Sequence, residues 1–428
     1  MKDRLHVPRE RYFDRGFFEL EKERLWSRTW QMACRLEEIP EPNDFTEYEI
    51  LDQSILVVRQ QDGSIKAFFN ACRHRATQLE RGAGRLAGGK FVCPFHGWQW
   101  NADGTNRLVY GKTGFAPECL RPDDLKLREC RAETWGGIVW INMDPNAGPL
   151  RDALHPIAGK LDEVGIEHMR VKWWKEVILN ANWKMAQEAF LEGYHVMQTH
   201  PQLTMGMGES YPADTGADYL VYENGHACFQ RKDMGAGGFA TVDQMLGFYN
   251  LLAQGMDAQI LDRDIHVLET LRNNLKPGED VMAASARVIR EYNEATGIPM
   301  PAGAELKPLY WGGDAFVFPN VFFLPYYSNV LAYRIRPYNN DPEMCRFDVW
   351  SLTTYPESHP PVRAKLLGRF DKEDADRWGL IPRQDFSNIE RQQRGLHTKG
   401  YEGHRLSTEW EGGIANMHFE LDRLLSRE

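Results

Sequence analysis

Residues 72–98, CRHRATQLERGAGRLAGGKFVCPFHGW, decide the fold that we expect for this chain. They contain Cys72-x-His74 and, after 18 further residues, Cys93-x2-His96. Each Cys–His pair lies in a glycine-bearing loop, and short β-like runs separated by Asp-Gly turn signals surround both pairs. The region therefore predicts a small all-β module of about 110 residues in which two loops present two thiols and two imidazoles.

Two thiolates and two imidazoles have two metal interpretations. Structural zinc sites usually group like ligands, as Cys-x2-4-Cys and His-x3-5-His. A Rieske [2Fe-2S] cluster instead takes two cysteines on one iron and two histidines on the other. Here each loop supplies one cysteine and one histidine, as the cluster requires if each iron draws one ligand from each loop. The order therefore favours a Rieske cluster bound by Cys72, His74, Cys93 and His96 over zinc.

The composition is that of an ordinary soluble protein with two or three domains. The chain has 428 residues, 42% apolar and 26% charged, with a net charge of −10. This acidic balance, without a dense basic block, argues against nucleic acid as the main partner. Seven cysteines fit a reducing cytoplasm better than a disulfide framework. The five outside the motif are expected to be buried, inert thiols: Cys34, Cys119, Cys130, Cys228 and Cys345.

Targeting and membrane signals are not expected. The N-terminal residues have no apolar stretch behind their charges, so we predict no secretory signal. The most apolar region, 315–333, is interrupted by Pro319, Pro325 and Asn329 and predicts strands and turns. We therefore expect a cytoplasmic protein without a membrane partner.

Changes of pattern along the chain predict a β module followed by a larger α+β domain. In the larger domain we expect a helix from Trp183 to about Gln198, a helical insertion near 241–300, strands from 316 to 354, and a helical tail from about 385 to 425. The predicted domains are N-terminal helices over 1–39, the β module over 40–155 and the larger domain over 156–428.

A second constellation lies in the predicted helix, where Glu192, His195 and His200 precede Pro201. Five residues turn a regular helix by about 500°, which leaves the two histidines roughly 140° apart in projection. They can bind one metal only if the helix ends or bulges between them, and Pro201 makes an end plausible. Glu192 lies three residues before His195 and can accept its other ring N–H. Hydrogen-bonded histidines without a metal are the alternative.

Two histidines and one carboxylate form the facial triad of mononuclear Fe(II) oxygenases. The paired motifs, Cys72-x-His74 with Cys93-x2-His96 and then Asn182-Trp-Lys with Glu192-x-Tyr-His195-x4-His200, occur together in one chain. This combination resembles the α subunit of Rieske non-haem iron ring-hydroxylating oxygenases along essentially the whole chain.

The resemblance implies an α+β protein with an all-β Rieske [2Fe-2S] domain and a helix-grip (START-like) catalytic domain built on an antiparallel sheet. It implies that Cys72, His74, Cys93 and His96 bind the cluster. It also implies His195, His200 and a downstream aspartate as ligands of Fe(II). The pattern Gln384-Asp385, then Glu390, then Gln393-Arg-Gly395 matches that aspartate, so Asp385 is the expected third ligand. A solvated aspartate near a helix start is the alternative.

The best-known ring dioxygenases of this family carry Asp at the position of Glu192, whereas Glu is similar to some members acting on quaternary amines. The resemblance implies that this residue links the iron-site histidine to a cluster histidine of a neighbouring subunit. It also implies a head-to-tail homotrimer, because cluster and iron within one subunit are too far apart for fast electron transfer. A β subunit in addition is possible within the family.

The resemblance implies a terminal oxygenase that hydroxylates an aromatic or hydrophobic substrate with O2. Oxidative demethylation or C–N cleavage of a quaternary amine or ether is the alternative. An electron-transfer Rieske protein would have no use for the second constellation. The chain lacks a dinucleotide fingerprint and a plant-type ferredoxin motif, so an NAD(P)H-dependent reductase, possibly with a ferredoxin, must supply the electrons.

We expect the substrate pocket to be walled by the predicted iron-site helix, by strand residues 316–327 and by the helical block at 241–276. The wall residues expected from the helix are Gln187, Phe190 and Leu191. The aromatic residues of 316–327 could line a pocket for a flat substrate, form a cation–π cage, or be ordinary strand core.

Overall fold

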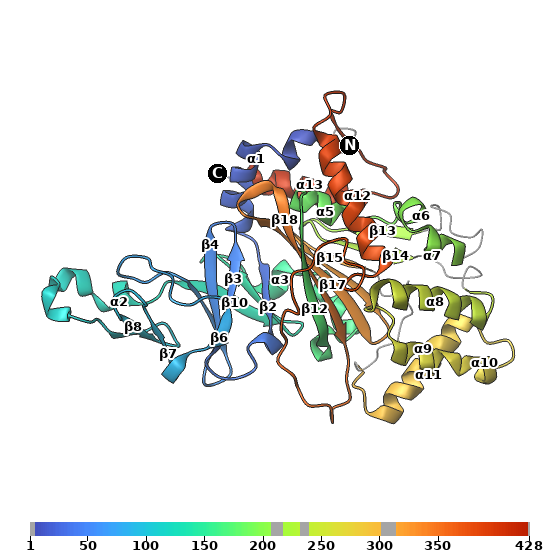
Figure 1. The fold of residues 1–428 in the computed structure, drawn as a ribbon, viewed down its shortest axis with the longest axis horizontal. Coiled ribbons are helices and arrows are strands. Elements are labelled where there is room, and N and C mark those ends of the chain that lie inside the picture. The colour runs from blue at the N-terminus through green and yellow to red at the C-terminus, as the bar shows by residue number, and fades with distance from the viewer. Residues whose placement is uncertain (1–4, 207–216, 232–238, 301–313, 427–428) are drawn as a thin grey trace. The chain divides into compact units, whose positions relative to one another are not determined.

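The computed structural model describes residues 5–206, 217–231, 239–300 and 314–426 (Figure 1). The chain forms two compact units. The larger comprises Met1–Arg24, Leu154–Pro360 and Lys365–Glu428, and the smaller comprises Leu25–Ala153 and Pro361–Ala364. The N-terminal segment expected over 1–39 is thus divided between the two units. Among the described residues, no helix has the length and apolarity needed to cross a membrane.

The smaller unit is all-β apart from short helical turns. Its main sheet has seven antiparallel strands in the order β2-β11-β10-β5-β4-β3-β6, and β7-β8-β9 form a second, three-stranded sheet. The strands are β2 (Gln31–Arg35), β3 (Asp44–Ile50), β4 (Gln53–Arg59), β5 (Ile65–Phe69), β6 (Ala83–Arg85), β7 (Lys90–Val92), β8 (Gln99–Asn101), β9 (Asn106–Leu108), β10 (Glu129–Trp135) and β11 (Ile138–Asn142). The short helices are α2 (Pro122–Leu125) and α3 (Leu150–Ala153).

The two Asp-Gly signals are turns, as the sequence predicts. Gly63 and Gly104 each have φ +84°, a left-handed conformation that glycine adopts without steric cost. Ahead of each glycine, the aspartate accepts a hydrogen bond from the backbone N–H two residues on, Asp62 from Ser64 and Asp103 from Thr105.

The larger unit is built on a seven-stranded antiparallel sheet in the order β12-β18-β17-β16-β15-β14-β13. These strands are β12 (Arg170–Leu179), β13 (Ala217–Val221), β14 (Ala227–Arg231), β15 (Ala315–Val317), β16 (Val321–Tyr326), β17 (Asn329–Tyr338) and β18 (Asp341–Thr353). A separate ribbon pairs β1 (His6–Pro8) with β19 (Gly403–Arg405). The expected strands after residue 316 are therefore present, and the sheet is antiparallel as expected.

Helices cover this sheet. α12 (Leu380–Leu396) packs against α5 (Trp183–Glu188), β12 and α8, and Figure 1 shows it lying along the sheet. The remaining helices are α1 (Arg15–Leu20), α4 (Ile157–Glu163), α6 (Val196–Thr199), α7 (Pro201–Gly206), α8 (Val242–Met256), α9 (Asp262–Glu269), α10 (Leu271–Asn274), α11 (Val281–Thr296) and α13 (Gly412–Leu425).

The segment expected to form a helical insertion contains α8 to α11. Thr241 caps α8 by accepting the Gln244 N–H, and Asp280 caps α11 by accepting two backbone N–H groups. Gly297 ends α11 in a left-handed conformation. The apolar faces of these helices share one core with Tyr326 and Tyr327 of the sheet.

Two expected helices differ from the structure. The helix predicted over 183–198 stops at Glu188, and residues 189–195 form turns before α6 begins. The break is stabilised because the Tyr219 hydroxyl accepts the Gly193 N–H at 2.9 Å and Glu192 Oε2 accepts the His195 N–H at 2.9 Å. The predicted tail is two helices, α12 and α13, with β19 between them.

Candidate metal centres and cavity

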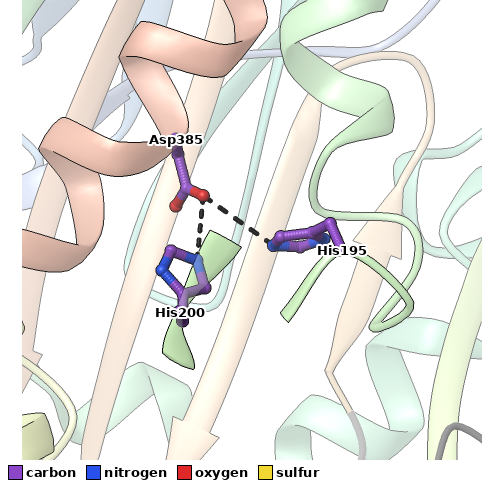
Figure 2. A group of neighbouring side chains, drawn as sticks. All are labelled: His195, His200 and Asp385. Carbon is purple, nitrogen blue, oxygen red and sulfur yellow. Dashed lines mark ion pairs between the residues drawn. The ribbon is translucent and has the colours of Figure 1, made fainter. Parts of the chain in front are cut away.

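His195, His200 and Asp385 lie together in the larger unit, and one ligand atom from each falls within 4.8 Å of the others. Figure 2 shows both imidazole rings turned toward the carboxylate. Asp385 Oδ1 lies 2.9 Å from His200 Nε2 and 3.8 Å from His195 Nε2. The ring centroids of His195 and His200 are 5.4 Å apart, and the angle between the ring planes is 75°. This is a donor set of two imidazoles and one carboxylate facing a common point.

The break in the predicted helix makes this arrangement possible. His195 precedes α6, and His200 directly follows it with a non-helical conformation, φ −120° and ψ 59°. The two side chains therefore do not keep the angular separation of a regular helix. Asp385 comes from α12, in a segment almost 200 residues later in the chain.

Hydrogen-bond acceptors behind the two histidines hold the proton of each imidazole on Nδ1. Glu192 Oε1 accepts from His195 Nδ1 at 2.8 Å, and Gln384 Oε1 accepts from His200 Nδ1 at 2.9 Å. Gln202 Nε2 donates to the same Gln384 oxygen at 2.8 Å, which orients the amide. With both Nδ1 atoms protonated, the lone pairs are on the Nε2 atoms, which face Asp385. The residues therefore fit a metal ion.

The rest of the downstream motif attaches α12 to the end of β12. Glu390 accepts from the Asn180 backbone N–H at 2.9 Å, and Gln393 accepts from the Asn182 N–H at 2.9 Å. Asn182 in turn caps α5 by accepting the Lys184 N–H. These bonds hold the helix that carries Asp385 beside the segment that leads to the two histidines.

Charge around His195 favours the imidazolium form when no metal is bound. Burial lowers the pKa of His195, but the neighbouring carboxylates of Glu192 and Asp385 outweigh burial and raise it to about 9. Imidazole binds a metal only in its neutral form, so metal binding at this site must displace a proton.

An apolar cavity of about 180 Å³ adjoins the three residues. Its walls include Phe190 and Leu191 from the turn after α5, as expected, whereas Gln187 is fully buried and lies outside the lining. The helical insertion contributes, from α8, Phe248, Leu252 and Met256. The sheet contributes Phe316, Phe322, Leu324 and Tyr333 among others. The insertion therefore walls the cavity.

The aromatic residues of 316–327 divide between two roles. Phe316 and Phe322 line the cavity, whereas Tyr326 and Tyr327 pack into the core of the helical insertion. A second, more polar cavity of about 560 Å³ borders Glu192, His195 and Asp385 from another side. The three-residue centre thus lies between an apolar cavity and a polar one.

In the smaller unit, the loops with the Cys–His pairs repeat one backbone pattern. The Cys72 N–H donates to Thr77 O and its carbonyl accepts from Ala76, at 2.9 Å each. The Cys93 N–H donates to Trp98 O at 2.8 Å, and its carbonyl accepts from Gly97 at 3.0 Å. Both loops turn through a left-handed residue at the fourth position after the cysteine, φ 62° at Ala76 and 69° at Gly97.

The loops bring the two histidines together and the two cysteines together. His74 Nδ1 and His96 Nδ1 are 3.1 Å apart, and backbone N–H groups of His74 and His96 point to the sulfurs of Cys72 and Cys93, respectively. Both cysteines are buried, whereas His74 is partly exposed and His96 is exposed. Two buried sulfurs behind two outward imidazoles suit a cluster with one thiolate-bound and one imidazole-bound iron.

Some site features were missed by sequence reasoning. Gln384 was recognised only as part of a pattern, and its bond to His200 depends on a contact across 184 residues. Asp314, a carboxylate in the cavity wall, follows no motif at all. Among the other cysteines, Cys119 is exposed rather than buried, and Cys228 lines the cavity with a pKa raised to about 11 by burial.

Comparison with family models gives two matches. The model described as ring hydroxylating alpha subunit (catalytic domain) matches residues 161–427. The model described as Rieske [2Fe-2S] domain matches residues 29–113. The second match contains both Cys–His loops, and the first contains the two histidines and Asp385.

Several curated relatives are similar over part of their length. The α subunit of 2-aminobenzenesulfonate 2,3-dioxygenase from Alcaligenes sp is 32% identical over 51% of this chain and 56% of the relative. The oxygenase subunit of carnitine monooxygenase from Escherichia coli is 33% identical over 49% of this chain and 54% of the relative. The large oxygenase component of naphthalene 1,2-dioxygenase from Pseudomonas putida is 33% identical over 46% of this chain and 44% of the relative. The chain spans about half the length of these relatives.

Solved structures share the fold over nearly the whole chain. A quaternary ammonium Rieske monooxygenase in complex with L-carnitine matches with a TM-score of 0.65 and 20% identity, over 98% of this chain and 95% of that chain. Naphthalene 1,2-dioxygenase from Rhodococcus sp. matches with a TM-score of 0.66 and 18% identity, over 98% of this chain and 94% of that chain. The fold is therefore a Rieske domain with a mixed helix and antiparallel-sheet catalytic domain, as the sequence predicts.

Proposed function

The chain belongs to the family of ring-hydroxylating α subunits, and from that premise we propose that it is the terminal oxygenase of a multicomponent system. It uses O2 and electrons from a separate reductase to hydroxylate an aromatic or otherwise hydrophobic substrate. The observation that carries this proposal is the placement of two imidazoles and a carboxylate at the wall of an apolar cavity. Such a cavity excludes water and receives an apolar substrate next to the metal.

In this proposal His195, His200 and Asp385 hold a mononuclear Fe(II). Bound there, the iron supplies the open coordination positions at which O2 chemistry occurs. Glu192 and Gln384 hold the Nδ1 protons, so that each Nε2 stays available as a donor. Phe190, with the aromatic residues of β15 and β16, positions the substrate and keeps water out.

Cys72, His74, Cys93 and His96 hold the Rieske cluster in the proposal. The exposure of the two imidazoles suits electron entry and exit through them. The sequence motif for dinucleotide binding is missing, so an NAD(P)H-dependent reductase, with or without a ferredoxin, supplies the electrons. We propose a homotrimer in which Glu192 connects His195 to the cluster of the next subunit.

Oxidative demethylation or C–N cleavage of a quaternary amine or ether is the second candidate. Glu192, in place of the aspartate of ring dioxygenases, favours it. Relatives named as carnitine monooxygenase and glycine betaine monooxygenase subunits, at 33% and 30% identity, support it as well. The aromatic cavity wall accommodates either substrate class, because rings pack on apolar substrates and attract cations.

Metal analysis tests the proposed iron site. Asp385→Ala and His200→Ala are each expected to lose the mononuclear iron while keeping the cluster absorbance and the rhombic resonance of the reduced cluster. Asp376→Ala, which removes an exposed carboxylate from the loop before α12, should keep both centres. A full complement of mononuclear iron in Asp385→Ala would show that another residue supplies the carboxylate.

A product screen then identifies the substrate class. Purified protein with a surrogate reductase is supplied with aromatic acids, polycyclic hydrocarbons and quaternary amines, and products are identified by mass. Hydroxylated rings support the first candidate, and loss of a methyl group or release of trimethylamine supports the second. Consumption of O2 without any oxygenated or dealkylated product across the panel would contradict both.

A further inference from the structure

One carboxylate in the cavity wall has no part in the proposed metal site. Asp314 directly precedes β15, and its backbone oxygen accepts the Phe229 N–H at 2.8 Å, which ties the residue to β14. Its side chain lines the same apolar cavity as His195, His200 and Asp385. The cavity therefore has a carboxylate beside β14 and β15, in addition to Glu192 and to Asp385 of α12.

The Asp314 side chain is partly buried, and one of its two carboxylate oxygens is unsatisfied. Oδ1 is buried, and it has no hydrogen-bond partner within the described part of the chain. Burial alone raises the pKa of Asp314 to about 7, and no cationic side chain in that part of the chain offsets this rise. The neighbouring cavity residues that sense its charge are Cys228 and Tyr333, and neither is a cation.

A buried carboxylate without a partner is costly, because it has lost its hydration and gained nothing in exchange. Such a group in a native protein calls for a reason, and a ligand that binds beside the carboxylate supplies one. That ligand must bring an N–H or O–H donor to the carboxylate, and a positive charge compensates the carboxylate best. The surrounding wall is apolar, so the remainder of the ligand must be apolar too.

We propose that Asp314 binds the protonated amine of the substrate, a primary or secondary ammonium group attached to an apolar body. This inference rests on the proposed oxygenase function and names the substrate class more closely. The ammonium donates to the Asp314 carboxylate, while the apolar body occupies the cavity that Asp314 and the three proposed ligands line. Asp314 is thus a specificity-determining residue of the cavity.

The geometry distinguishes this ligand from two similar ones. A quaternary ammonium carries charge but has no N–H, so it donates no hydrogen bond to the carboxylate. A neutral alcohol has a donor but leaves the carboxylate charge uncompensated. A protonated amine supplies both, and a charge-assisted hydrogen bond of this kind is about twice as strong as a neutral one.

Binding of four matched probes tests the inference: benzylamine, toluene, benzyl alcohol and benzyltrimethylammonium. An apolar cavity of about 150 Å³ holds benzene, so a single ring suits the volume observed here. Affinities are measured anaerobically by calorimetry on protein loaded with cluster and iron, without reductase. Wild type should bind benzylamine about ten- to a hundredfold more tightly than each of the other probes.

Asp314→Asn should remove most of that preference while changing toluene binding by less than about twofold. Asp314→Leu, which fills the same wall with an apolar side chain, should bind toluene more tightly than benzylamine. The matched control is Asp243→Asn, which removes an exposed carboxylate from α8, the helix that walls the cavity, and should leave all four affinities unchanged.

Three results would overturn the inference. They are equal binding of benzylamine and toluene by wild type, an unchanged benzylamine preference in both Asp314 variants, and binding of benzyltrimethylammonium as tight as that of benzylamine. The result of this binding test is independent of the test of the oxygenase proposal, because binding is measured without turnover. Asp314-dependent amine binding without any oxygenated product would contradict the oxygenase proposal and leave this inference standing. If the protein oxygenated apolar substrates but bound benzylamine equally well with and without Asp314, the oxygenase proposal would stand and this inference would be wrong.

Discussion

Replacement of Gln384 by methionine should weaken iron binding although Gln384 is not one of the proposed iron ligands. In the metal-bound form His200 must keep its proton on Nδ1, where Gln384 Oε1 accepts it at 2.9 Å. Without metal, the proton can instead reside on Nε2 and be donated to Asp385 Oδ1, 2.9 Å away. Losing Gln384 therefore penalises the metal-bound form more than the metal-free form.

The size of the effect follows from that asymmetry. Removal of a partner that orients a metal-binding histidine costs about 10- to 100-fold in metal affinity, or about 1.4–2.7 kcal/mol. The buried position of His200, 3% exposed, leaves little water to replace the lost acceptor. We therefore expect the dissociation constant for Fe(II) to rise by about 10- to 100-fold in Gln384→Met.

Anaerobic equilibrium dialysis of Fe(II) against cluster-loaded protein measures this constant. Gln392→Met is the matched control, because it makes the same replacement at an exposed position of α12. It should bind iron as wild type does. If folded Gln384→Met, with a normal cluster spectrum, bound Fe(II) within about twofold of wild type, the role assigned to the Nδ1 partner would be wrong.

Three further outcomes are expected. Glu21→Ala removes one partner of the fully buried ion pair with Lys184 (2.7 Å). In a urea titration it should lower the free energy of unfolding by about 3–5 kcal/mol. Glu19→Ala, which removes one partner of an exposed ion pair, should lower it by less than about 1 kcal/mol. Gly379→Ala should prevent correct packing of α12 against α8, since a Cβ there would lie 1.8 Å from a backbone oxygen, whereas Gly395→Ala, with no atom within 4 Å, should fold normally by circular dichroism. Brief treatment with a chelator should remove the mononuclear iron and abolish O2-dependent turnover while the cluster absorbance remains, and Fe(II) should restore turnover.

Motifs with short spacing were the part of the site most accessible from sequence. The two Cys–His loops lie within 27 residues, and the order and spacing of their ligands favour a Rieske cluster over zinc. The structure places the two imidazoles of these loops 3.1 Å apart at Nδ1. Asp385, far along the chain, was selected only by resemblance to a family pattern, and it lies beside the two histidines.

Features that depend on contacts between distant segments could not be predicted from the sequence. Residues 189–191, Ala-Phe-Leu, continue the apolar pattern of a helix, and the break after Glu188 is held by the Tyr219 hydroxyl on β13. Gln31–Arg35 lies in a segment where aromatic spacing suggests helix, yet it forms a fully buried strand through pairing with β11. In both cases tertiary contacts override the local pattern.

We propose that the centre formed by His195, His200 and Asp385 inserts oxygen from O2 into the substrate with an electron from the cluster. A single-turnover reaction with ¹⁸O2, following product mass and cluster oxidation in the same sample, tests it most directly. The substrate is the best compound from the product screen. Wild type should form labelled product as its cluster becomes oxidised, whereas Asp385→Ala should keep a reduced cluster and form none. Labelled product from Asp385→Ala at the wild-type yield would contradict the claim.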